Sequence, residues 1–258
     1  ADFLLVDDLR ELKPSHVFFA GKLVAENGKM VVPVLDRSFS LENQNSLYVR
    51  ELTTEDFILK VDSPDGTVSI NLLDYPNPVM PFTAHSTADV AVKDGKILLS
   101  GTDMSYVAVV NRHKGYNTIG LGVVRGFGIK KGALASTVSH DSHNLTIVYD
   151  TPENALLAAQ NLIRCGGGMC AVEDGTVLHT LELPLAGLMS LKPAEELAVC
   201  CQAMKDAERR LGLTAPENPL LRIVTLALPV VPELKMTDLG MVDVLQKKLV
   251  PLLAEGDR

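Results

Sequence analysis

The feature that most constrains the fold is a helix with clear start and stop signals in the second half of the chain. Thr151 can cap this helix, and Pro152 can take its first position, where the missing N–H costs nothing. Apolar residues then recur at helical spacing as far as Ile163, and the glycine run Gly166–Gly168 predicts the end of the helix. The elements on either side of this helix therefore decide the fold class.

These neighbouring elements alternate between strand and helix. The apolar run Leu145–Tyr149 predicts a buried strand before the helix. After the helix, Met169–Val172 and Thr176–Leu183 predict a hairpin, and Pro193 opens a long amphipathic helix. An order of strand, helix, strand, strand, helix is typical of an α/β or α+β protein, and we assign the chain to the α+β class.

The N-terminal part of the chain predicts short strands and turns. Asn27-Gly28 between two apolar runs is a strong hairpin signal, and Ser63–Gly66 predicts a turn between segments. The strands predicted here are Phe3–Val6, Val17–Ala20, Leu23–Ala25, Met30–Val34, Leu47–Val49 and Phe57–Val61. We therefore place a domain boundary after residue 62, which gives domains at residues 1–62 and 63–258.

Composition and charge argue against several classes of partner. The net charge is −8, and an acidic surface repels phosphate backbones, so we expect no nucleic-acid partner. No apolar run approaches the roughly 20 residues of a membrane span, and no signal-peptide pattern is present, so we expect no membrane association. Four cysteines in 258 residues give no disulfide framework, which favours a reducing, cytoplasmic setting.

The densest polar cluster is the run Ser139-His140-Asp141-Ser142-His143-Asn144, which leads into the predicted strand Leu145–Tyr149. Its imidazole, carboxylate and amide groups can move protons, bind a metal or hold a heteroaromatic base. In an extended strand, Asp141 and His143 share one face and His140 lies on the other, so both imidazoles reach one ligand only if the backbone turns here. A polar loop with histidines bonded to the backbone is the structural alternative.

Other motifs of known chemistry are incomplete. Gly120–Gly126 superficially resembles a dinucleotide-binding turn, but no amphipathic helix opens after it, so we predict kinked strands or close backbone packing. The chain has no His-x-Glu with a later Pro-Cys-x-x-Cys, no Gly-x-Ser-x-Gly and no His-x-His, since His140 and His143 form His-x-x-His. Read alone, the sequence contains no complete catalytic constellation.

Stretches that point to one family occur in order along nearly the whole chain. They are Ala1–Phe3 through Gly21–Val24, Gly115 through Asn144, Gly166–Gly168, Leu183–Ser190, and Leu226–Val230 through Thr237-Asp238. In this order they resemble the bacterial and archaeal adenine deaminases of the metal-dependent amidohydrolase superfamily.

The resemblance implies an architecture. Residues 1–62 would be the returning half of a small β-sandwich, and residues 63–258 the mixed α/β C-terminal domain of adenine deaminases. The (β/α)8 barrel that carries the main metal ligands would precede Ala1, which agrees with a chain that begins without Met and with an apparent strand already under way. We expect this upstream barrel to be a partner of the chain within one protein, and the intact protein to be a homo-oligomer.

The resemblance also implies a reaction, the hydrolysis of adenine to hypoxanthine and ammonia in purine salvage. A divalent metal, Mn or Fe and alternatively Zn, would be bound mainly by the barrel and would activate the attacking water. We predict that His140, Asp141 and His143 close the site over the base or join its proton or metal network. Ser142 and Asn144 are the candidates for contact with the substrate, and we expect this piece alone to be inactive.

Two other functions remain open at this point. The first is a regulatory or oligomerisation module, in which the His140–His143 pair would be buried, bonded to backbone and far from any pocket. The second is a free-standing purine-binding domain, which the start in mid-strand at Ala1 disfavours and a purine titration would test.

Overall fold

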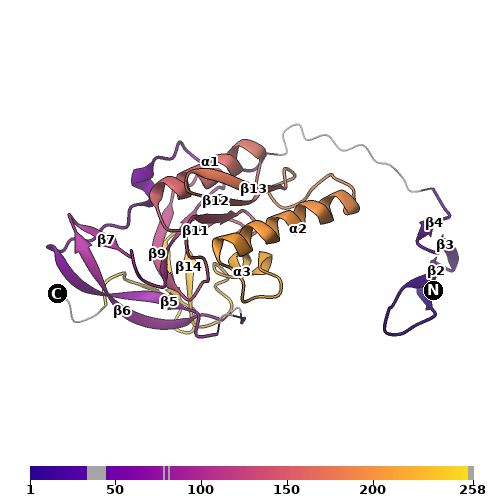
Figure 1. Cartoon of the computed structure of the whole chain (residues 1–258), viewed down its shortest axis with the longest axis horizontal. Coiled ribbons are helices and arrows are strands. Elements are labelled where there is room, and N and C mark those ends of the chain that lie inside the picture. The colour runs from indigo at the N-terminus through magenta and orange to yellow at the C-terminus, as the bar shows by residue number, and fades with distance from the viewer. Residues whose placement is uncertain (34–44, 78, 81, 255–258) are drawn as a thin grey trace. The chain divides into compact units, whose positions relative to one another are not determined.

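The computed structural model describes residues 1–33, 45–77, 79–80 and 82–254. It divides into two compact units, Ala1–Ser40 and Leu41–Arg258, and many of their elements are labelled in Figure 1. The three clusters of buried apolar side chains consist of residues from the larger unit. Within the described ranges, no helix is long and apolar enough to cross a membrane.

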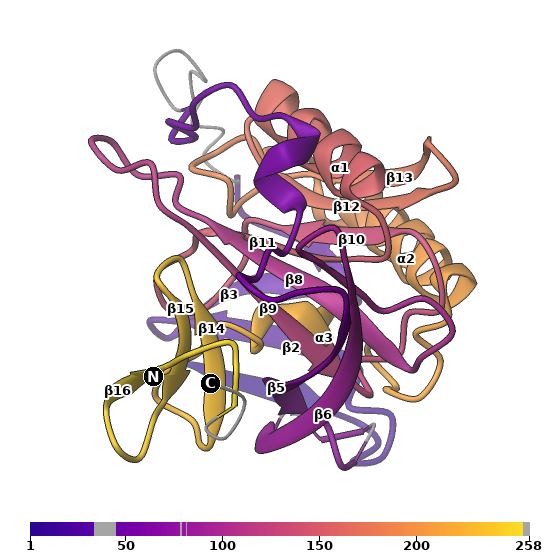
Figure 2. The ribbon, with the colours of Figure 1, turned by 90° about the vertical axis from the view of Figure 1, so that its left-hand side faces the viewer.

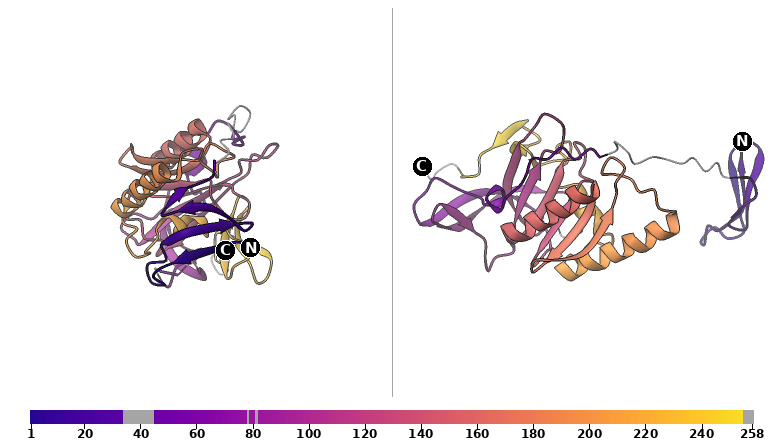
Figure 3. Two further views of the ribbon diagram at one scale, coloured as in Figure 1. Left: turned by 90° about the vertical axis from the view of Figure 1, so that its right-hand side faces the viewer. Right: turned by 90° about the horizontal axis from the view of Figure 1, so that it is seen from above.

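The smaller unit is an antiparallel sheet in the order β1-β2-β3-β4, with its strands side by side (Figure 3). Asn27, with a φ of 49°, and Gly28 form the turn between β3 and β4, as the Asn-Gly pair predicts. β4 ends at Met30, so it is shorter than predicted, and Val34 lies outside the described residues. The strands are β1 (Phe3–Val6), β2 (Pro14–Phe19), β3 (Lys22–Glu26) and β4 (Lys29–Met30).

A nine-stranded sheet forms the centre of the larger unit, in the described order β13-β12-β10-β11-β8-β9-β5-β6-β7. Its neighbouring strands pair antiparallel, except that β5 and β9 pair parallel. The strands are β5 (Gly66–Asp74), β6 (Ala84–Lys93), β7 (Lys96–Leu98), β8 (Met104–Val110), β9 (Ile119–Arg125), β10 (Ala133–Ser136), β11 (Leu145–Tyr149), β12 (Gly168–Glu173) and β13 (Thr176–Glu182). With few helices around a large mixed sheet, the α+β prediction is confirmed.

The sheet is covered on both faces, because successive residues of a strand point to opposite sides. In β8, Val107 and Val109 join the core under helices α2 and α3, whereas Ala108 and Val110 join the core under α1. Helix α1 thus lies on one face and α2 and α3 on the other (Figure 1). The helices are α1 (Pro152–Cys165), α2 (Ala194–Leu211) and α3 (Leu220–Val224), with a 3-10 turn η1 (Thr54–Phe57) beside α1.

A small second sheet, in the order β14-β15-β16, packs against β8 and β9 (Figure 2). Its strands are β14 (Leu234–Thr237), β15 (Gly240–Asp243) and β16 (Lys248–Val250). Leu234, Met236 and Met241 are buried in the same core as α2 and α3. The residues after α3 therefore complete the cover on this face of the large sheet.

Helix α1 begins and ends where the sequence predicts, and helix α2 begins where the sequence predicts. Thr151 accepts a hydrogen bond from the Asn154 backbone N–H at 3.4 Å, and α1 ends at Gly166, whose φ of 83° lies in the left-handed region. Helix α2 begins directly after Pro193. These signals are local, which explains why they could be interpreted without the tertiary structure.

The strands predicted at Leu47–Val49 and Phe57–Val61 are wrong. Leu47–Val49 is irregular, and Phe57 ends the 3-10 turn η1. Phe57 packs edge-to-face on Tyr149, with ring centroids 5.8 Å apart, and the Tyr149 hydroxyl donates to the Phe57 carbonyl at 2.8 Å. Burial against the sheet thus outweighs strand propensity here. Residues 45–62 belong to the larger compact unit. The assignment of residues 1–62 to a β-sandwich half and of residues 63–258 to a C-terminal domain stays a prediction.

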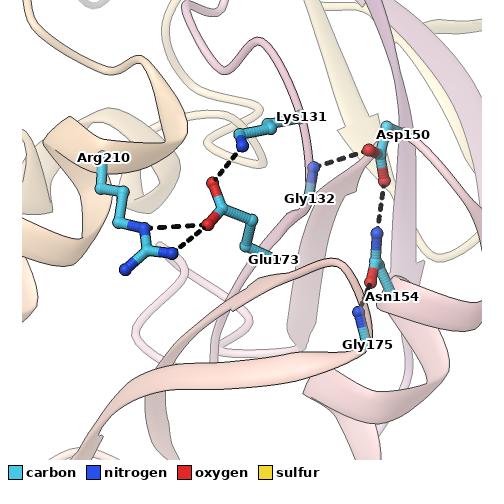
Figure 4. Close-up of polar contacts among 7 residues, drawn as sticks. All are labelled: Lys131, Gly132, Asp150, Asn154, Glu173, Gly175 and Arg210. Carbon is cyan, nitrogen blue, oxygen red and sulfur yellow. Dashed lines mark hydrogen bonds and ion pairs between the residues drawn. The ribbon is translucent and has the colours of Figure 1, made fainter.

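Two polar networks fix one end of the strands β10–β12 (Figure 4). Glu173, at the end of β12, forms ion pairs with Arg210 of α2 at 2.5 Å and with Lys131 at 2.8 Å. Asp150 accepts from the side-chain amide of Asn154 at 2.8 Å, which joins α1 to the end of β11. These contacts attach both helices to the sheet at the end opposite to the polar run 139–144.

Candidate functional site

The other end of these strands gathers loops from distant parts of the sequence. Residues 111–118 join β8 to β9, residues 137–144 join β10 to β11, and residues 183–190 follow β13. The loops contact one another directly: Thr137 Oγ1 donates to the Gly187 carbonyl at 2.6 Å and accepts from the Gly168 N–H at 2.8 Å. Stretches that resemble one family in the sequence therefore meet at one edge of the large sheet.

The polar run at this edge turns sharply instead of continuing as a strand. The His143 N–H donates to the Ser139 carbonyl at 2.6 Å, and His143 has a φ of 52°. At the base of the loop, the Ser139 and Thr146 hydroxyls are 2.7 Å apart. The turn brings the His140 and His143 rings edge-to-face, with centroids 5.4 Å apart. The backbone turn that both imidazoles need in order to reach one ligand is therefore present.

His140 borders a pocket of about 380 Å³. Its backbone N–H donates to the Val224 carbonyl at 3.1 Å, which fixes the loop against the end of α3. The pocket wall combines four apolar residues with five polar or charged ones. Its lining residues are Val79, His140, Pro216, Glu217, Asn218, Leu221, Arg222, Val224 and Thr225. Apolar walls with a few converging polar groups are typical of small-molecule sites.

The remaining predicted residues occupy two different environments. Asp141 and Ser142 are exposed at the tip of the loop. Asn144 is 2 % exposed, and its side-chain amide donates to Asp238 Oδ1 at 3.3 Å. Asn144 is thus a residue of the loop base, whereas Asp141 and Ser142 are accessible to a binding partner.

Arg112, the second residue after the end of β8, is the central residue beneath the loop. It is 2 % exposed, and its Nε–H donates to the His143 carbonyl. One terminal nitrogen, Nη1, donates to the Ser46 hydroxyl at 2.5 Å, and the other, Nη2, donates to the Ala186 carbonyl at 3.1 Å. The next residue, His113, lies with its Nε2 2.6 Å from the Ser142 carbonyl. Since a carbonyl only accepts, this nitrogen carries the proton.

Asp238, in the turn between β14 and β15, holds the base of the loop from the other side. Its carboxylate accepts from the Asn111 side-chain amide at 2.9 Å and from the Thr118 hydroxyl at 2.5 Å. It also accepts the Asn144 amide described above. A carboxylate with several neutral donors is well satisfied without a cation.

The electrostatics of the loop favour neutral imidazole at His143. Burial lowers the pKa of His143 below its usual range, and the nearby His140 and Arg112 act in the same direction, whereas Asp141 opposes them. Its Nδ1 atom is buried and has no hydrogen-bond partner in the described part of the chain. A neutral imidazole near pH 7 can accept a proton or a hydrogen bond from a ligand.

The same residues do not fit a complete metal centre. Among the residues that the structure describes, no group of three or more His, Cys, Asp or Glu side chains is arranged to hold a metal ion. His140 and His143 contact each other, and Asp141 is exposed at the loop tip. A metal at this site would need further ligands besides those that the described residues offer.

The sequence predicts the polar loop but not the residues that hold it. Arg112 and His113 lie in a short polar segment that predicts a solvated turn, and Asp238 lies in a stretch that resembles the family without a signal of its own. The bonds from these three side chains to the loop join residues 29 to 94 positions apart. No local spacing encodes such contacts.

Comparison with known proteins finds the same family that the sequence stretches resemble. Residues 81–248 match the family model described as the adenine deaminase C-terminal domain. The adenine deaminase of Moorella thermoacetica is 40% identical over 255 residues, which cover 98% of this chain and 42% of the relative. Adenine deaminase 2 of Carboxydothermus hydrogenoformans is 40% identical over 256 residues (98% and 43%), and the adenine deaminase of Geobacillus kaustophilus is 37% identical over 255 residues (98% and 44%).

The chain thus spans less than half the length of these relatives. The matched range contains the three loops at the edge of the sheet together with Asp238, Arg112 and the whole run Ser139–Asn144. On this match over most of its length, the chain belongs to the adenine deaminase C-terminal domain family.

Proposed function

We propose that the chain is the C-terminal part of a metal-dependent adenine deaminase and that its His140–Asn144 loop forms part of the active site. In the reaction, the oxygen of water bonds to C6 of adenine, the bond from C6 to the exocyclic nitrogen breaks, and hypoxanthine and ammonia result. The observation that carries the proposal is the turned loop, with two imidazoles in contact and one of them at the border of a pocket, inside the range that matches the family.

The loop offers groups suited to hold a purine and to move protons. His140 borders the pocket, and the His143 imidazole, with its lowered pKa, is neutral near pH 7. The apolar side chains of Leu221 and Val224 give the pocket walls that suit a flat heteroaromatic ring. Asp141 and Ser142, exposed in this chain, are available to the part of the site supplied by the rest of the protein. When the site closes, exclusion of water strengthens each polar contact with the base.

The metal belongs to the rest of the protein in this proposal. A divalent ion, Mn or Fe and alternatively Zn, held mainly by an upstream barrel, supplies an activated water when it is bound. The residues of this chain orient the base and exclude solvent around it. The intact protein is proposed to be a cytoplasmic homo-oligomer, and the four free cysteines of this chain suit a reducing compartment.

The experiment that tests the loop is substitution of its histidines in the full-length enzyme. We expect His140→Ala and His143→Ala each to lower kcat/KM for adenine by about 100-fold or more, because positioned acid–base groups contribute about that much. The measurement is the rate of ammonia release at several adenine concentrations, with thermal unfolding as a check on folding.

His85→Ala is the matched control, because His85 is a histidine of β6 that bonds to Asn71 and lies in another part of the sheet. We expect its kcat/KM to stay within a factor of about two of the parent value. A similarly small change in both loop variants would remove the loop from the reaction and favour a structural module.

The regulatory-module alternative requires a histidine pair that is enclosed and far from any pocket. His140 instead borders the pocket of about 380 Å³, and His143 keeps a buried ring nitrogen without a partner among the described residues. These features favour the enzymatic proposal. A titration of the isolated chain with adenine tests the third alternative, a domain that binds purines by itself.

A further inference from the structure

Arg112 is a buried arginine whose charge is not balanced by a carboxylate in the described part of the chain. It is 2 % exposed, and in the described part of the chain it forms no ion pair with a carboxylate. Removing a guanidinium from water is costly unless its N–H groups are satisfied. Here they are satisfied by backbone carbonyls and one hydroxyl, so the side chain acts as a multiple hydrogen-bond donor.

The acceptors of Arg112 come from three separate segments of the chain. They are the Ser46 hydroxyl and carbonyl before η1, the His143 carbonyl in the loop, and the Ala186 carbonyl after β13. The rigid planar fork of a guanidinium can satisfy such divergent acceptors at once, whereas an ammonium group on a flexible stem fixes them poorly. Arg112 therefore sets the distance between the loop and its two neighbours.

Arg112 and its neighbour His113 bond to two consecutive carbonyls of the loop. Arg112 donates to the His143 carbonyl, and His113 donates to the Ser142 carbonyl at 2.6 Å. Consecutive residues after β8 thus hold consecutive peptide groups beside the candidate side chains. The two hydrogen bonds therefore restrain the backbone at His143, and the backbone sets the orientation of the His143 ring.

We propose that Arg112 is a positioning residue that fixes the His140–His143 loop in the conformation that acts on the substrate. The proposal rests on the proposed function of the loop and extends it to a residue that does not contact the substrate. Arg112 acts through the backbone of His143, and His113 assists it. A small displacement of reacting groups is sufficient to lower a rate by about 100-fold, so this restraint has a measurable consequence.

The test uses Arg112→Met in the full-length enzyme, with Arg125→Met as the matched control. Arg125 is a half-buried arginine at the other end of the β8–β9 pair, about 20 Å of strand away, where it bonds to Asp74 and Ser86. We expect Arg112→Met to lower kcat about 10- to 100-fold, with a smaller change in KM, and the control to change kcat by less than about threefold.

A second readout follows the loop without using activity. Hydrogen exchange at the His143 amide, which donates to Ser139, reports the conformation of the loop. We expect faster exchange over residues 139–145 in Arg112→Met and unchanged exchange there in Arg125→Met. Unchanged exchange in Arg112→Met, or a loss of activity no larger than in the control, would overturn the proposal.

Two further variants keep the test decisive if Arg112→Met folds poorly. Arg112→Lys retains the charge but not the fork, so we expect intermediate exchange and an intermediate kcat. Arg112→Ala should regain part of its activity when guanidinium is added at a non-denaturing concentration, and no regain would count against positioning by hydrogen bonds. If Arg112→Met loosens the loop while His140→Ala and His143→Ala keep full activity, the proposed function of the loop fails, and with it the catalytic relevance of Arg112.

Discussion

At the scale of single residues, buried charges in this domain are stabilised in different ways. Glu173 is paired with two cations, whereas Arg222 stacks over the Tyr75 ring, 3.6 Å from its centroid, and donates to backbone carbonyls. Among the residues that the structure describes, Glu208 of α2 has neither kind of partner. It is fully buried, and both of its carboxylate oxygens lack a hydrogen-bond partner in the described residues. Burial therefore raises the pKa of Glu208 to about 8.

This raised pKa predicts a specific dependence of stability on pH. The unfolded chain loses the Glu208 proton near its ordinary pKa of about 4.5, whereas the folded protein keeps it up to about pH 8. The stability gained from the protonated form is present at low pH and is lost as the pH rises through this window. We expect Glu208→Gln to raise the free energy of unfolding by about 2–4 kcal/mol at pH 8 and to change it little at pH 4.5, measured by urea unfolding.

Glu195→Gln is the control for this comparison, because Glu195 is exposed in the first turn of the same helix. Its effect on unfolding should be small and nearly the same at both pH values. Equal unfolding midpoints of Glu208→Gln and the parent at pH 8 would show that Glu208 is solvated or paired in solution.

At the scale of elements, the glycines of β9 allow the small sheet to approach the large one. A Cβ atom at Gly120 would lie 2.0 Å from the Thr237 carbonyl, and one at Gly122 would lie 2.8 Å from the Met236 sulfur. The glycine-rich stretch is therefore a place of close backbone packing, which is one of the interpretations predicted from its sequence. The turn that approaches Gly120 carries Asp238, so this packing also places the carboxylate that holds Asn144.

The two glycines provide a matched pair of substitutions. Gly120→Ala forces a methyl group against a backbone carbonyl that belongs to a paired strand, whereas Gly122→Ala meets the flexible end of a methionine. We expect Gly120→Ala to lower the free energy of unfolding by about 3 kcal/mol and Gly122→Ala by about 1 kcal/mol or less. Thermal and urea unfolding measure both, and a larger effect at Gly122 would contradict the packing described here.

At the scale of the whole molecule, the chain corresponds to less than half of the length of the relatives compared above. It spans 42% to 44% of the relatives compared above, and its described residues form no metal centre. In the proposed function, the groups that bind the metal lie in the rest of the protein. The loop at the edge of the large sheet is the part of the chain that we propose to meet them.

This division of the site predicts that the chain alone does not release ammonia from adenine. We expect activity when the chain is combined with separately expressed upstream chain in the presence of Mn²⁺, because the metal then supplies the activated water. A colorimetric ammonia assay on each piece and on the mixture measures this. Activity of this chain alone would contradict the division, and a mixture made with His143→Ala serves as the control for dependence on the loop.

Local signals in the sequence were sufficient for much of the larger unit. The capped helix after Thr151, the strand Leu145–Tyr149 and the hairpin that follows α1 are all present as predicted. The strands predicted at Leu47–Val49 and Phe57–Val61 are absent, and in the second stretch the burial of Phe57 against Tyr149 decided the conformation. Pattern and capping act over a few residues, whereas packing against a distant side chain has no local signature.

By itself, the sequence determined the α+β class, the positions of the main helices and the polar run Ser139–Asn144. Only the tertiary structure decided that this run turns back on itself and that His140 and His143 meet. It also revealed that Arg112 and Asp238 hold the loop in place. The physical reason is that helix caps and strand periodicity depend on neighbours in the chain, whereas a hydrogen bond between residues far apart exists only after the sheet has brought its loops to one edge.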